Sequence, residues 1–189
     1  MGIMGTLLKN KHADEAALAW NMPALAGPET LELRSDDFPA GGTMPTAHAG
    51  KRAGGANISP ALAWNSAPAE TAQLLLVIED VDAPTKKPFV HCVALIDPEV
   101  TAVPAGELNS ASPTAGVQIL RSGMGRGYHG PEPIKGHGPH RYVFQVFALS
   151  APVTTADAGD LTKARPRAVL AAVSGRVLAR GRVDGIYER

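Results

Sequence analysis

Residues 129–149 read HGPEPIKGHGPHRYVFQVFAL, a loop of histidine, proline and glycine that leads directly into a strand pattern over 142–149. Two further segments share the apolar, β-branched and aromatic character of that strand: QLLLVIED at 73–80 and FVHCVALI at 89–96. No helical pattern of about 10–15 residues separates these strands, as a βαβ fold would require. The sequence therefore predicts a mainly β protein with antiparallel strands.

Shorter elements are predicted around these three strands. Weaker patterns predict three more extended segments, of which the last is broken by two glycines: 31–34, 117–120 and 177–187. Short helices are expected at 13–20 and at 166–173, where a proline in the first position suits a helix. The stretch 36–55, rich in Gly, Pro and Ala, is predicted to be a loop.

The composition limits what the chain can be. Its 189 residues suit one domain, and 18 basic against 18 acidic residues leave no net charge to attract nucleic acid or an anionic membrane. No apolar run approaches the ~20 residues of a membrane helix, and no secretory signal pattern opens the chain. We therefore expect a cytoplasmic protein without a transmembrane segment. The single cysteine, Cys92, excludes an internal disulfide and suits a reducing compartment.

Two aspartates follow the pattern of the strand 73–80. By the alternation of a strand, Asp80 lies on the same face as Leu76 and Ile78 and points toward the core. Asp82 keeps this parity if the chain stays extended, and Pro84 stiffens the turn that follows. A core-facing carboxylate needs partners, because an unpaired buried charge is costly. The alternative is a pair of turn-forming aspartates before a proline.

His91 interrupts an otherwise apolar strand. Its ring could be a neutral core group that bonds a backbone carbonyl. It could instead line a cavity beside Asp80, which would give both side chains a partner and raise the pKa of the imidazole. Alternation places Cys92 on the opposite face of the strand from His91, as a buried and inert thiol among Val90, Ala94 and Ile96.

The loop before the strand 142–149 supplies a second wall for such a cavity. His140 and Tyr142 share a strand parity, so an imidazole and a phenol project to one side. Gly130 allows close backbone approach to a small ligand, and Pro131 holds the loop in place. Imidazole, phenol and exposed backbone N–H groups around a concavity suit a small oxyanion, such as phosphate or a carboxylate.

Three titratable or charged neighbours are expected to contribute nothing to this site. His129 and His137 are interpreted as solvated loop residues. Arg141 faces away from His140 and Tyr142 by parity, so its role is expected to be structural.

Three stretches carry a resemblance to a known family: NISPALAWNSAP at 57–68, EDVDAP at 79–84 followed by His91, and GYHGPEPIKGHGPHRYVFQVFAL at 127–149. With the C-terminal GRVDGIYER, they make the chain resemble the phosphatidylethanolamine-binding protein family, in its bacterial, Raf-kinase-inhibitor-like branch. The joint presence of D-x-D-A-P and G-P…H-R-Y at this spacing is specific, whereas neither motif is specific alone.

The resemblance implies a β-sandwich of two antiparallel sheets with a few short peripheral helices. It also implies a pocket that binds phosphate-like and acetate-like anions, including phospholipid headgroups. Two groups of residues would form that pocket: Asp80, Asp82, Pro84 and His91 on one side, and Gly130, Pro131, His140 and Tyr142 on the other. Three residues depart from the family pattern and leave the identity of the ligand open: Val81, in place of the usual proline, and Val90 and Cys92, where aromatic residues are common.

The resemblance also divides the chain. Residues 29–189 would form the family domain, and residues 1–28 would form an N-terminal helical extension packed on the core or on a second subunit. The extension contains large apolar residues that need cover: Leu7, Leu8, Leu18 and Trp20. Because bacterial relatives often form dimers, a homodimer is expected.

The function predicted from these residues is non-catalytic binding of a small anion or phospho-ligand, without a cofactor. Docking of phosphorylated partners would be one regulatory use of such a pocket. No protein partner can be named from the sequence.

Two alternatives use the same residues. One is a hydrolase with His91 or His140 as general base, although neither Ser59 nor Ser66 lies in a recognisable nucleophile motif. The other is a metal site, for which the ligands would be Asp80, Asp82, His91 and His140. The H-x-x-H spacing of His137 and His140 cannot align the two rings on a helix, because a glycine and a proline lie between them.

Overall fold

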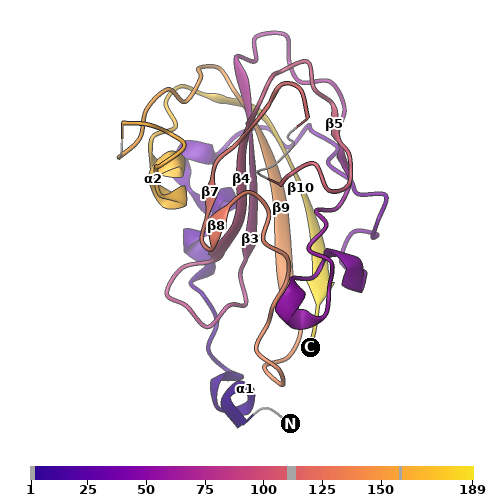
Figure 1. Cartoon of the computed structure of the whole chain (residues 1–189). Coiled ribbons are helices and arrows are strands. Elements are labelled where there is room, and N and C mark those ends of the chain that lie inside the picture. The colour runs from indigo at the N-terminus through magenta and orange to yellow at the C-terminus, as the bar shows by residue number, and fades with distance from the viewer. Residues whose placement is uncertain (1–2, 110–113, 158) are drawn as a thin grey trace.

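The structure, a computed structural model, describes residues 3–109, 114–157 and 159–189. Its centre is a sheet of six strands (Figure 1) in the order β1-β10-β9-β3-β4-β6. The strand bounds are Gly42–Thr43 for β1, Val177–Tyr187 for β10, His140–Leu149 for β9, Gln73–Asp80 for β3, Phe89–Ile96 for β4 and Val117–Ile119 for β6. Neighbouring strands are antiparallel, except that β1 is parallel to β10.

Shorter elements surround the sheet. Two strand pairs lie outside it, β2 (Leu62–Ala63) with β5 (Ala102–Val103) and β7 (Arg121–Ser122) with β8 (Gly125–Arg126). The described ranges also hold two short α-helices, α1 (Ile3–Leu8) and α2 (Pro166–Ala171), and five 3-10 turns, Glu15–Ala17, Ala19–Asn21, Pro23–Leu25, Thr46–His48 and Lys51–Ala53. The predicted mainly β fold with short peripheral helices is confirmed.

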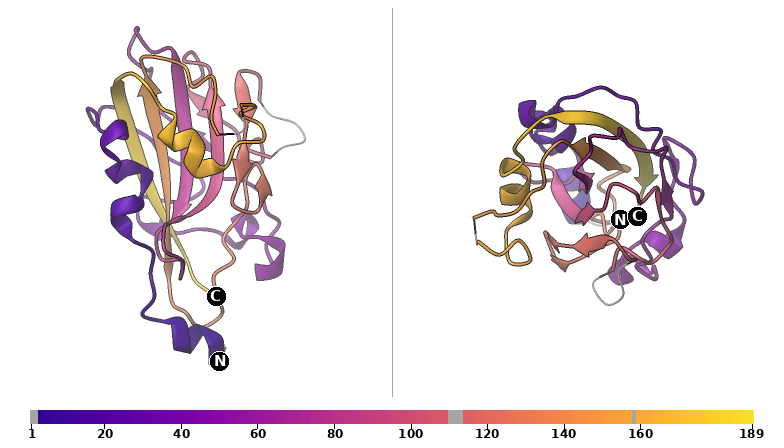
Figure 2. Two further views of the ribbon diagram at one scale, coloured as in Figure 1. Left: turned by 90° about the vertical axis from the view of Figure 1, so that its left-hand side faces the viewer. Right: turned by 90° about the horizontal axis from the view of Figure 1, so that it is seen from above.

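Both faces of the sheet are buried, and a different part of the chain covers each face. On one face, Leu76 of β3 packs in a core with residues of 31–64 and 103–128, the layer that contains the short strands β2 and β5. On the other face, Leu75 packs with residues of the N-terminal 3-10 turns and of α2, which lie over the same side of the sheet (Figure 2). Because neither face of β3 meets solvent, a polar site has room only at the end of the sheet.

The strands of the sheet agree with their sequence patterns, and β10 is more regular than predicted. β3 and β4 have the predicted bounds, and β9 begins two residues earlier, at His140. β10 continues through Gly181 and Gly185, both of which pair with β9. A Cβ atom on Gly181 would lie 2.2 Å from the carbonyl oxygen of Leu31. This glycine therefore allows a neighbouring segment to pack closely and does not end the strand.

Two sequence predictions are wrong. The segment 13–20 is not a helix but part of a series of 3-10 turns, because its backbone N–H groups bond to side chains of the sheet. The amide of Ala19 donates to Glu79 Oε2 at 2.8 Å, and the amide of Trp20 donates to Gln145 Oε1 at 2.7 Å. These two amides are therefore not available for the backbone hydrogen bonds of a regular helix. The segment 31–34 forms a single bridge, from Arg34 to Ala63, and not a strand.

The chain itself covers most of the apolar N-terminal residues. Leu18 and Leu25 are fully buried, and the guanidinium of Arg180 lies 3.9 Å from the centre of the Trp20 ring. Leu7 on α1 remains 78% exposed. Within the described ranges, no helix has the length and apolar character to cross a membrane.

Candidate functional site

A cavity of about 240 Å³ lies where β3 ends and where β4 and β9 begin. Six charged or titratable side chains line it: Arg52, Asp80, His91, His129, Glu132 and His140. The rest of the wall is formed by Ala83, Pro84, Phe89, Met124, Pro133 and Ile134. Of the eight residues predicted for the site, Asp80, Pro84, His91 and His140 therefore line one cavity.

A β-bulge turns His91 toward this cavity. Ile78 pairs with Cys92 and the next residue, Glu79, pairs with Val90, so His91 has no partner in the ladder. Such a bulge re-aims the side chain of the extra residue. The imidazole of His91 consequently contacts the ring of Tyr142, with 5.1 Å between ring centroids, on the face of β9 that also carries Phe144.

The bulge changes the prediction for Cys92. Cys92 packs with Ala94 and Ile96 as expected, but Val90 belongs to the core on the other face of the sheet. The thiol is fully buried, and burial raises its pKa to about 12. The predicted burial of Cys92 is confirmed, whereas simple alternation between His91 and Cys92 is wrong.

His91 is neutral in this setting. Its Nδ1 atom lies 2.5 Å from the carbonyl oxygen of His129 and must donate to it. Burial lowers the pKa of His91 to about 4, although the nearby Asp80 acts in the opposite direction. The predicted rise in this pKa is therefore wrong. Because Nδ1 carries the proton, Nε2 is a hydrogen-bond acceptor, and it has no partner in the described part of the chain.

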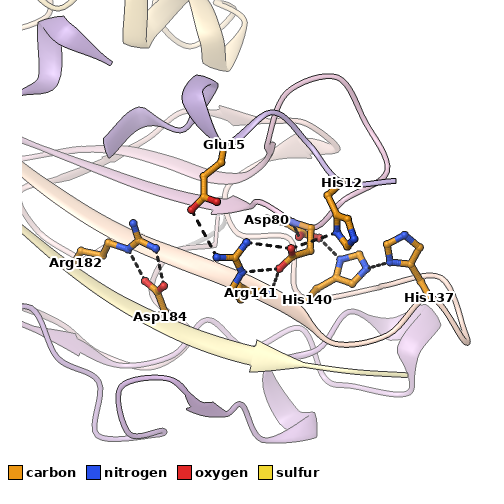
Figure 3. A network of polar contacts seen from close by, with 9 residues as sticks. His12, Glu15, Asp80, His137, His140, Arg141, Arg182 and Asp184 are labelled. Atoms are coloured by element: carbon orange, nitrogen blue, oxygen red, sulfur yellow. Dashed lines mark hydrogen bonds and ion pairs between the residues drawn. The ribbon is translucent and has the colours of Figure 1, made fainter. Parts of the chain in front are cut away.

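Asp80 and His140 form a buried pair that continues to a third residue (Figure 3). His140 Nδ1 lies 2.7 Å from Asp80 Oδ2, and His140 Nε2 lies 2.8 Å from His137 Nδ1. The second oxygen of Asp80 accepts a bond from the backbone amide of Asp82 at 2.9 Å. Both ring nitrogens of His140 are thus engaged within the protein, so this residue contributes charge and shape to the wall rather than a free donor.

The structure does not place Asp82 on the cavity wall, because the chain turns after Asp80 and reverses the expected parity. The Asp82 carboxylate accepts bonds from the backbone amide, Nε and Nη2 of Arg141, at 2.8, 3.0 and 3.2 Å. Burial alone would raise the pKa of Asp82, but the bonds from Arg141 outweigh it and hold this pKa below its ordinary value. Asp82 therefore anchors the start of β9, and Arg141 has the predicted structural position outside the cavity.

Gly130 and Pro131 also lie outside the wall. The amide of Gly130 donates to Asn57 Oδ1 at 2.7 Å, and the carbonyl of Pro131 accepts from the amide of Gly50 at 3.0 Å. A Cβ atom on Gly130 would lie 2.2 Å from the carbonyl oxygen of His48. Gly130 does allow close backbone approach, but to another part of the chain and not to a ligand.

Tyr142 lies next to the cavity without lining it. Its ring is in contact with His91 and lies 6.4 Å from the ring of His140. Burial and the neighbouring Asp80 raise the pKa of Tyr142 well above its ordinary value. Its hydroxyl is buried and has no hydrogen-bond partner within the described residues. Because this hydroxyl is buried and lies off the cavity wall, the polar group next to it is the Asp80 carboxylate and not a ligand in the cavity.

The interpretation of two histidines as solvated loop residues is wrong. His137 is 2% exposed and bonds His140, because the turn through Gly138 and Pro139 brings the two rings together without a helix. His129 stacks on His91 at 5.9 Å, and its Nε2 lies 3.5 Å from Glu132 Oε2. The H-x-x-H spacing was the signal in the sequence that could have found the pair of His137 and His140.

Arg52, Phe89 and Glu132 on the wall also escaped the sequence analysis. Arg52 and Glu132 belong to loops without a strand pattern, so no parity argument reaches them. In the structure, Glu132 Oε1 accepts a bond from the backbone amide of Arg52 at 2.9 Å, which joins the two loops.

The residues proposed for a metal site are used in other contacts. Asp82 is bound to Arg141, and His140 has both nitrogens engaged. In the three described ranges, no three His, Cys, Asp or Glu side chains are grouped as ligands of a metal ion.

Comparisons with known proteins agree on one family. The sequence profile described as "Phosphatidylethanolamine-binding protein" matches residues 34–188. A UPF0098 protein of Aquifex aeolicus is 32% identical over 165 residues, which cover 87% of this chain and 92% of that protein. Phomoidride biosynthesis cluster protein B of a fungal species is 30% identical over 98% of this chain and 92% of its own length. The crystal structure of Escherichia coli YbcL, described as a member of the mammalian PEBP family, superposes with a TM-score of 0.74 at 25% identity, over 85% of this chain and 99% of YbcL.

Proposed function

The chain belongs to the phosphatidylethanolamine-binding protein family, and we propose that it is a non-catalytic protein that binds small anions in the cavity beside His91. The ligand would be phosphate, a phospholipid headgroup or a carboxylate, or the phosphate of a modified side chain on a partner protein. The observation that carries the proposal is a set of groups without partners around one small cavity. On the cavity wall, His91 Nε2 has no hydrogen-bond partner and Arg52 has no carboxylate within 4.0 Å, in both cases among the described residues.

The charges around the cavity support anion binding that is coupled to the uptake of a proton by His91. Arg52 is an exposed cation on the wall, while Glu132 is already engaged by the Arg52 amide and lies close to His129. His91 is neutral, so its Nε2 would donate to an anion only after it has gained a proton. A bound anion favours that protonated form and raises the pKa of His91 from about 4.

The direction of the pH dependence follows from this coupling. The protonated imidazole holds the anion more tightly than the neutral one, so affinity should rise as the pH falls through the pKa of the complex. It should level off below the pKa of the free protein, about 4. Binding should therefore be stronger at pH ~5.5 than at pH ~8, the range in which histidine commonly titrates.

The absence of catalysis is part of the proposal, and one serine contact supports it. Ser59 Oγ accepts bonds from the backbone amides of Gly106 and Leu108, at 3.1 and 3.2 Å, and the residue does not line the cavity. A hydrolase that uses His91 or His140 as base remains the alternative. Release of nitrophenol from generic carboxylic and phosphate esters, lost in His91→Ala, would favour that alternative.

The experiment is calorimetric titration with phosphate, acetate and phosphoethanolamine, in two buffers that differ in ionisation enthalpy. The heat difference between the buffers counts the protons taken up, and uptake is expected between the pKa of His91 in the free protein, about 4, and its higher pKa in the complex. Arg52→Ala and His91→Ala should each weaken binding by about tenfold or more, as expected for a charge-assisted bond worth about 1.5–3 kcal/mol. Lys51→Ala, on the same turn but not on the wall, is the matched control. No binding of any of the three ligands would refute the proposal, as would equal loss in the Lys51 and Arg52 variants.

We also propose a cytoplasmic homodimer. The exposed Leu7 on α1 supports self-association, although Leu18 and Trp20 already find cover within the chain. Light scattering at micromolar concentration should give twice the monomer mass, and Leu7→Glu should reduce it. A monomer mass for the parent protein would contradict this part of the proposal.

A further inference from the structure

A row of buried groups leads from the cavity wall to the N-terminal segment (Figure 3). Asp80 Oδ2 lies 2.7 Å from His140 Nδ1, and His140 Nε2 lies 2.8 Å from His137 Nδ1. At the far end, His137 Nε2 lies 3.2 Å from the carbonyl oxygen of Lys11. We call these four groups the histidine chain. It links a residue of the cavity wall to a segment that has no place in the cavity.

The number of protons in the histidine chain follows from its three contacts. Each contact needs one proton between its two heavy atoms, because a hydrogen bond joins a donor to an acceptor. The carbonyl of Lys11 can only accept, so His137 Nε2 must carry a proton. The contact between the two rings needs a second proton, and the contact with Asp80 needs a third. Two neutral imidazoles and an ionised carboxylate hold only two.

The third proton makes the histidine chain electrically neutral as a whole. It leaves either an imidazolium beside an ionised Asp80 or two neutral rings beside a protonated Asp80. Both arrangements complete all three hydrogen bonds. Without the third proton the chain carries one negative charge at a site where Asp80, His137 and His140 are all buried, which is unfavourable.

We propose that this third proton is a switch that couples the cavity to the N-terminal segment 9–13. With the proton, the histidine chain holds the segment against the loop that carries His137. Without it, the contact with the Lys11 carbonyl is lost and the segment is released. His137 is thus a positioning residue, since it acts on the cavity through His140.

The contact with Lys11 is the one that loss of a proton breaks. It is the longest of the three, and residues 9–12 are exposed, so the freed carbonyl can bond to water at little cost. The contact between Asp80 and His140 has no such replacement, because both side chains are buried. Fixed points lie on either side of the released segment. Gly5 of α1 packs closely on the backbone of 135–137, and the amide of Asp14 donates to the carbonyl of Lys86.

Other titratable and charged groups face the histidine chain from every element packed against it. They are Asp82 after β3, His91 on β4, Arg141 and Tyr142 on β9, Lys11 and His12 on the N-terminal segment, and the C-terminal residue Arg189, whose carbonyl oxygen accepts a bond from the amide of Gly136 at 3.1 Å. Asp82 and Arg141 neutralise each other. His12 is the competing titratable group, since its ring lies 5.6 Å from that of His137 and its Nδ1 lies 3.4 Å from Asp82 Oδ1.

The switch also sets the response of the cavity to pH, a step that rests on the proposed function. An anion is repelled by the two-proton chain, which is negative, and not by the neutral three-proton chain. It therefore binds the three-proton form more tightly and, by reciprocity, raises the pH at which the third proton leaves. A tenfold preference for the three-proton form would raise that midpoint by up to about one pH unit.

The test is nuclear magnetic resonance of the unliganded, 15N-labelled full chain from pH ~5 to ~9, the range around histidine titration. Imidazole 15N shifts report the protons on His137 and His140, and the 1H–15N heteronuclear NOE of residues 9–13 reports order on the picosecond to nanosecond timescale. The two signals should change with one shared midpoint, and residues 9–13 should become more mobile on the alkaline side. His137→Gln, which can donate to Lys11 but cannot take up the extra proton, should remove the change in mobility. His12→Gln should keep it.

The outcomes separate the switch from the proposed function. The parent protein alone can refute the switch. It does so if the mobility of residues 9–13 is constant over the whole pH range, or if that mobility changes without a matching change in the imidazole 15N shifts. A mobility transition that survives in His137→Gln, or that disappears in His12→Gln, also refutes the switch. Inorganic phosphate is then added to the parent protein. An upward shift of the midpoint supports the coupling to the cavity, whereas binding of phosphate without any shift refutes that coupling. If phosphate does not bind, the proposed function fails for this ligand. The transition of the unliganded protein still shows whether the proton switch exists.

Discussion

Replacement of Arg167 by Met should destabilise the protein by about 3 kcal/mol, because it leaves a buried carboxylate without its cation. Glu79 on β3 is 0% exposed. Arg167 Nη2 lies 2.6 Å from Glu79 Oε1, in an ion pair whose geometry is not that of a hydrogen bond. The same guanidinium donates to the carbonyl oxygens of Ala17 and Pro88. Arg167 therefore joins β3, the N-terminal turns and the chain just before β4.

The magnitude follows from the burial of the pair. Removal of one partner of a buried ion pair typically costs about 3–5 kcal/mol. The Arg167 side chain is 27% exposed, so water weakens its interaction with Glu79 and the lower end of that range applies. The other bonds of Glu79, from the Ala19 amide and from Gln145 Nε2, remain in the variant. They prevent a larger loss.

The loss should depend on pH in a defined direction. Burial raises the pKa of Glu79, although Arg167 and the hydrogen bonds of Glu79 lower it. A raised folded-state pKa gives a contribution to stability that is present at low pH and lost as the pH rises through that pKa. Removal of Arg167 raises this pKa further. The deficit of Arg167→Met should therefore be larger at pH ~7 than at pH ~5, where Glu79 of the variant takes up a proton.

The assay is urea unfolding followed by circular dichroism at both pH values, with Glu79→Gln and the double variant as companions. Glutamine is uncharged and keeps an oxygen for the Ala19 amide, so the double variant should lose much less stability than the sum of the single variants. A deficit below about 1 kcal/mol in Arg167→Met at neutral pH would refute the reasoning, since that is the value of an exposed pair. A deficit that Glu79→Gln leaves unchanged would refute it too.

Three further predictions concern residues around the site. Gly130→Ala should lower the free energy of unfolding by about 1–3 kcal/mol, because its Cβ would meet the His48 carbonyl oxygen; unchanged thermal stability would show that the loop yields easily. Asp82→Asn should cost about 1–3 kcal/mol at neutral pH. Since Arg141 holds the pKa of Asp82 below its ordinary value, the parent protein should lose this advantage over the variant as the pH falls from ~5 to ~3, and a constant difference in urea unfolding would contradict the pairing. Cys92 should react with a thiol reagent only on unfolding, and rapid labelling of the native protein would show that the interior opens at this strand.

The sequence predicted the sheet well because its strands carry a strong local signal. β3 and β4 are apolar over eight residues each, and their patterns define both bounds. Parity also placed Asp80 and Tyr142 on one face, and the structure pairs these two residues across β3 and β9. Because both faces of these strands are buried, the fold requires apolar residues along their whole length, and the sequence has them. The local preference of each segment therefore agrees with its place in the fold.

The remainder of the site could not be predicted because it depends on where regular structure stops. Parity ceases to apply one residue after Asp80, and Asp82 consequently points to Arg141. The bulge at His91 depends on the pairing of two strands and leaves no mark in the sequence of β4. The contact of His137 with His140 depends on a turn whose shape the tertiary structure sets. In each case the neighbours that decide the geometry are distant in sequence.

The two acidic residues at the end of β3 have charged partners of different kinds. Glu79 and Asp80 are adjacent and buried, and alternation sends them to opposite faces of the sheet. Glu79 meets a guanidinium, which stays charged at every physiological pH, so its environment is constant. Asp80 meets an imidazole that leads to a second imidazole and then to a backbone carbonyl. An imidazole exists in a neutral and a charged form, whereas a guanidinium does not, so the partner of Asp80 can change its charge and the partner of Glu79 cannot. Asp80 and His140 are also the members of these pairs that line the cavity.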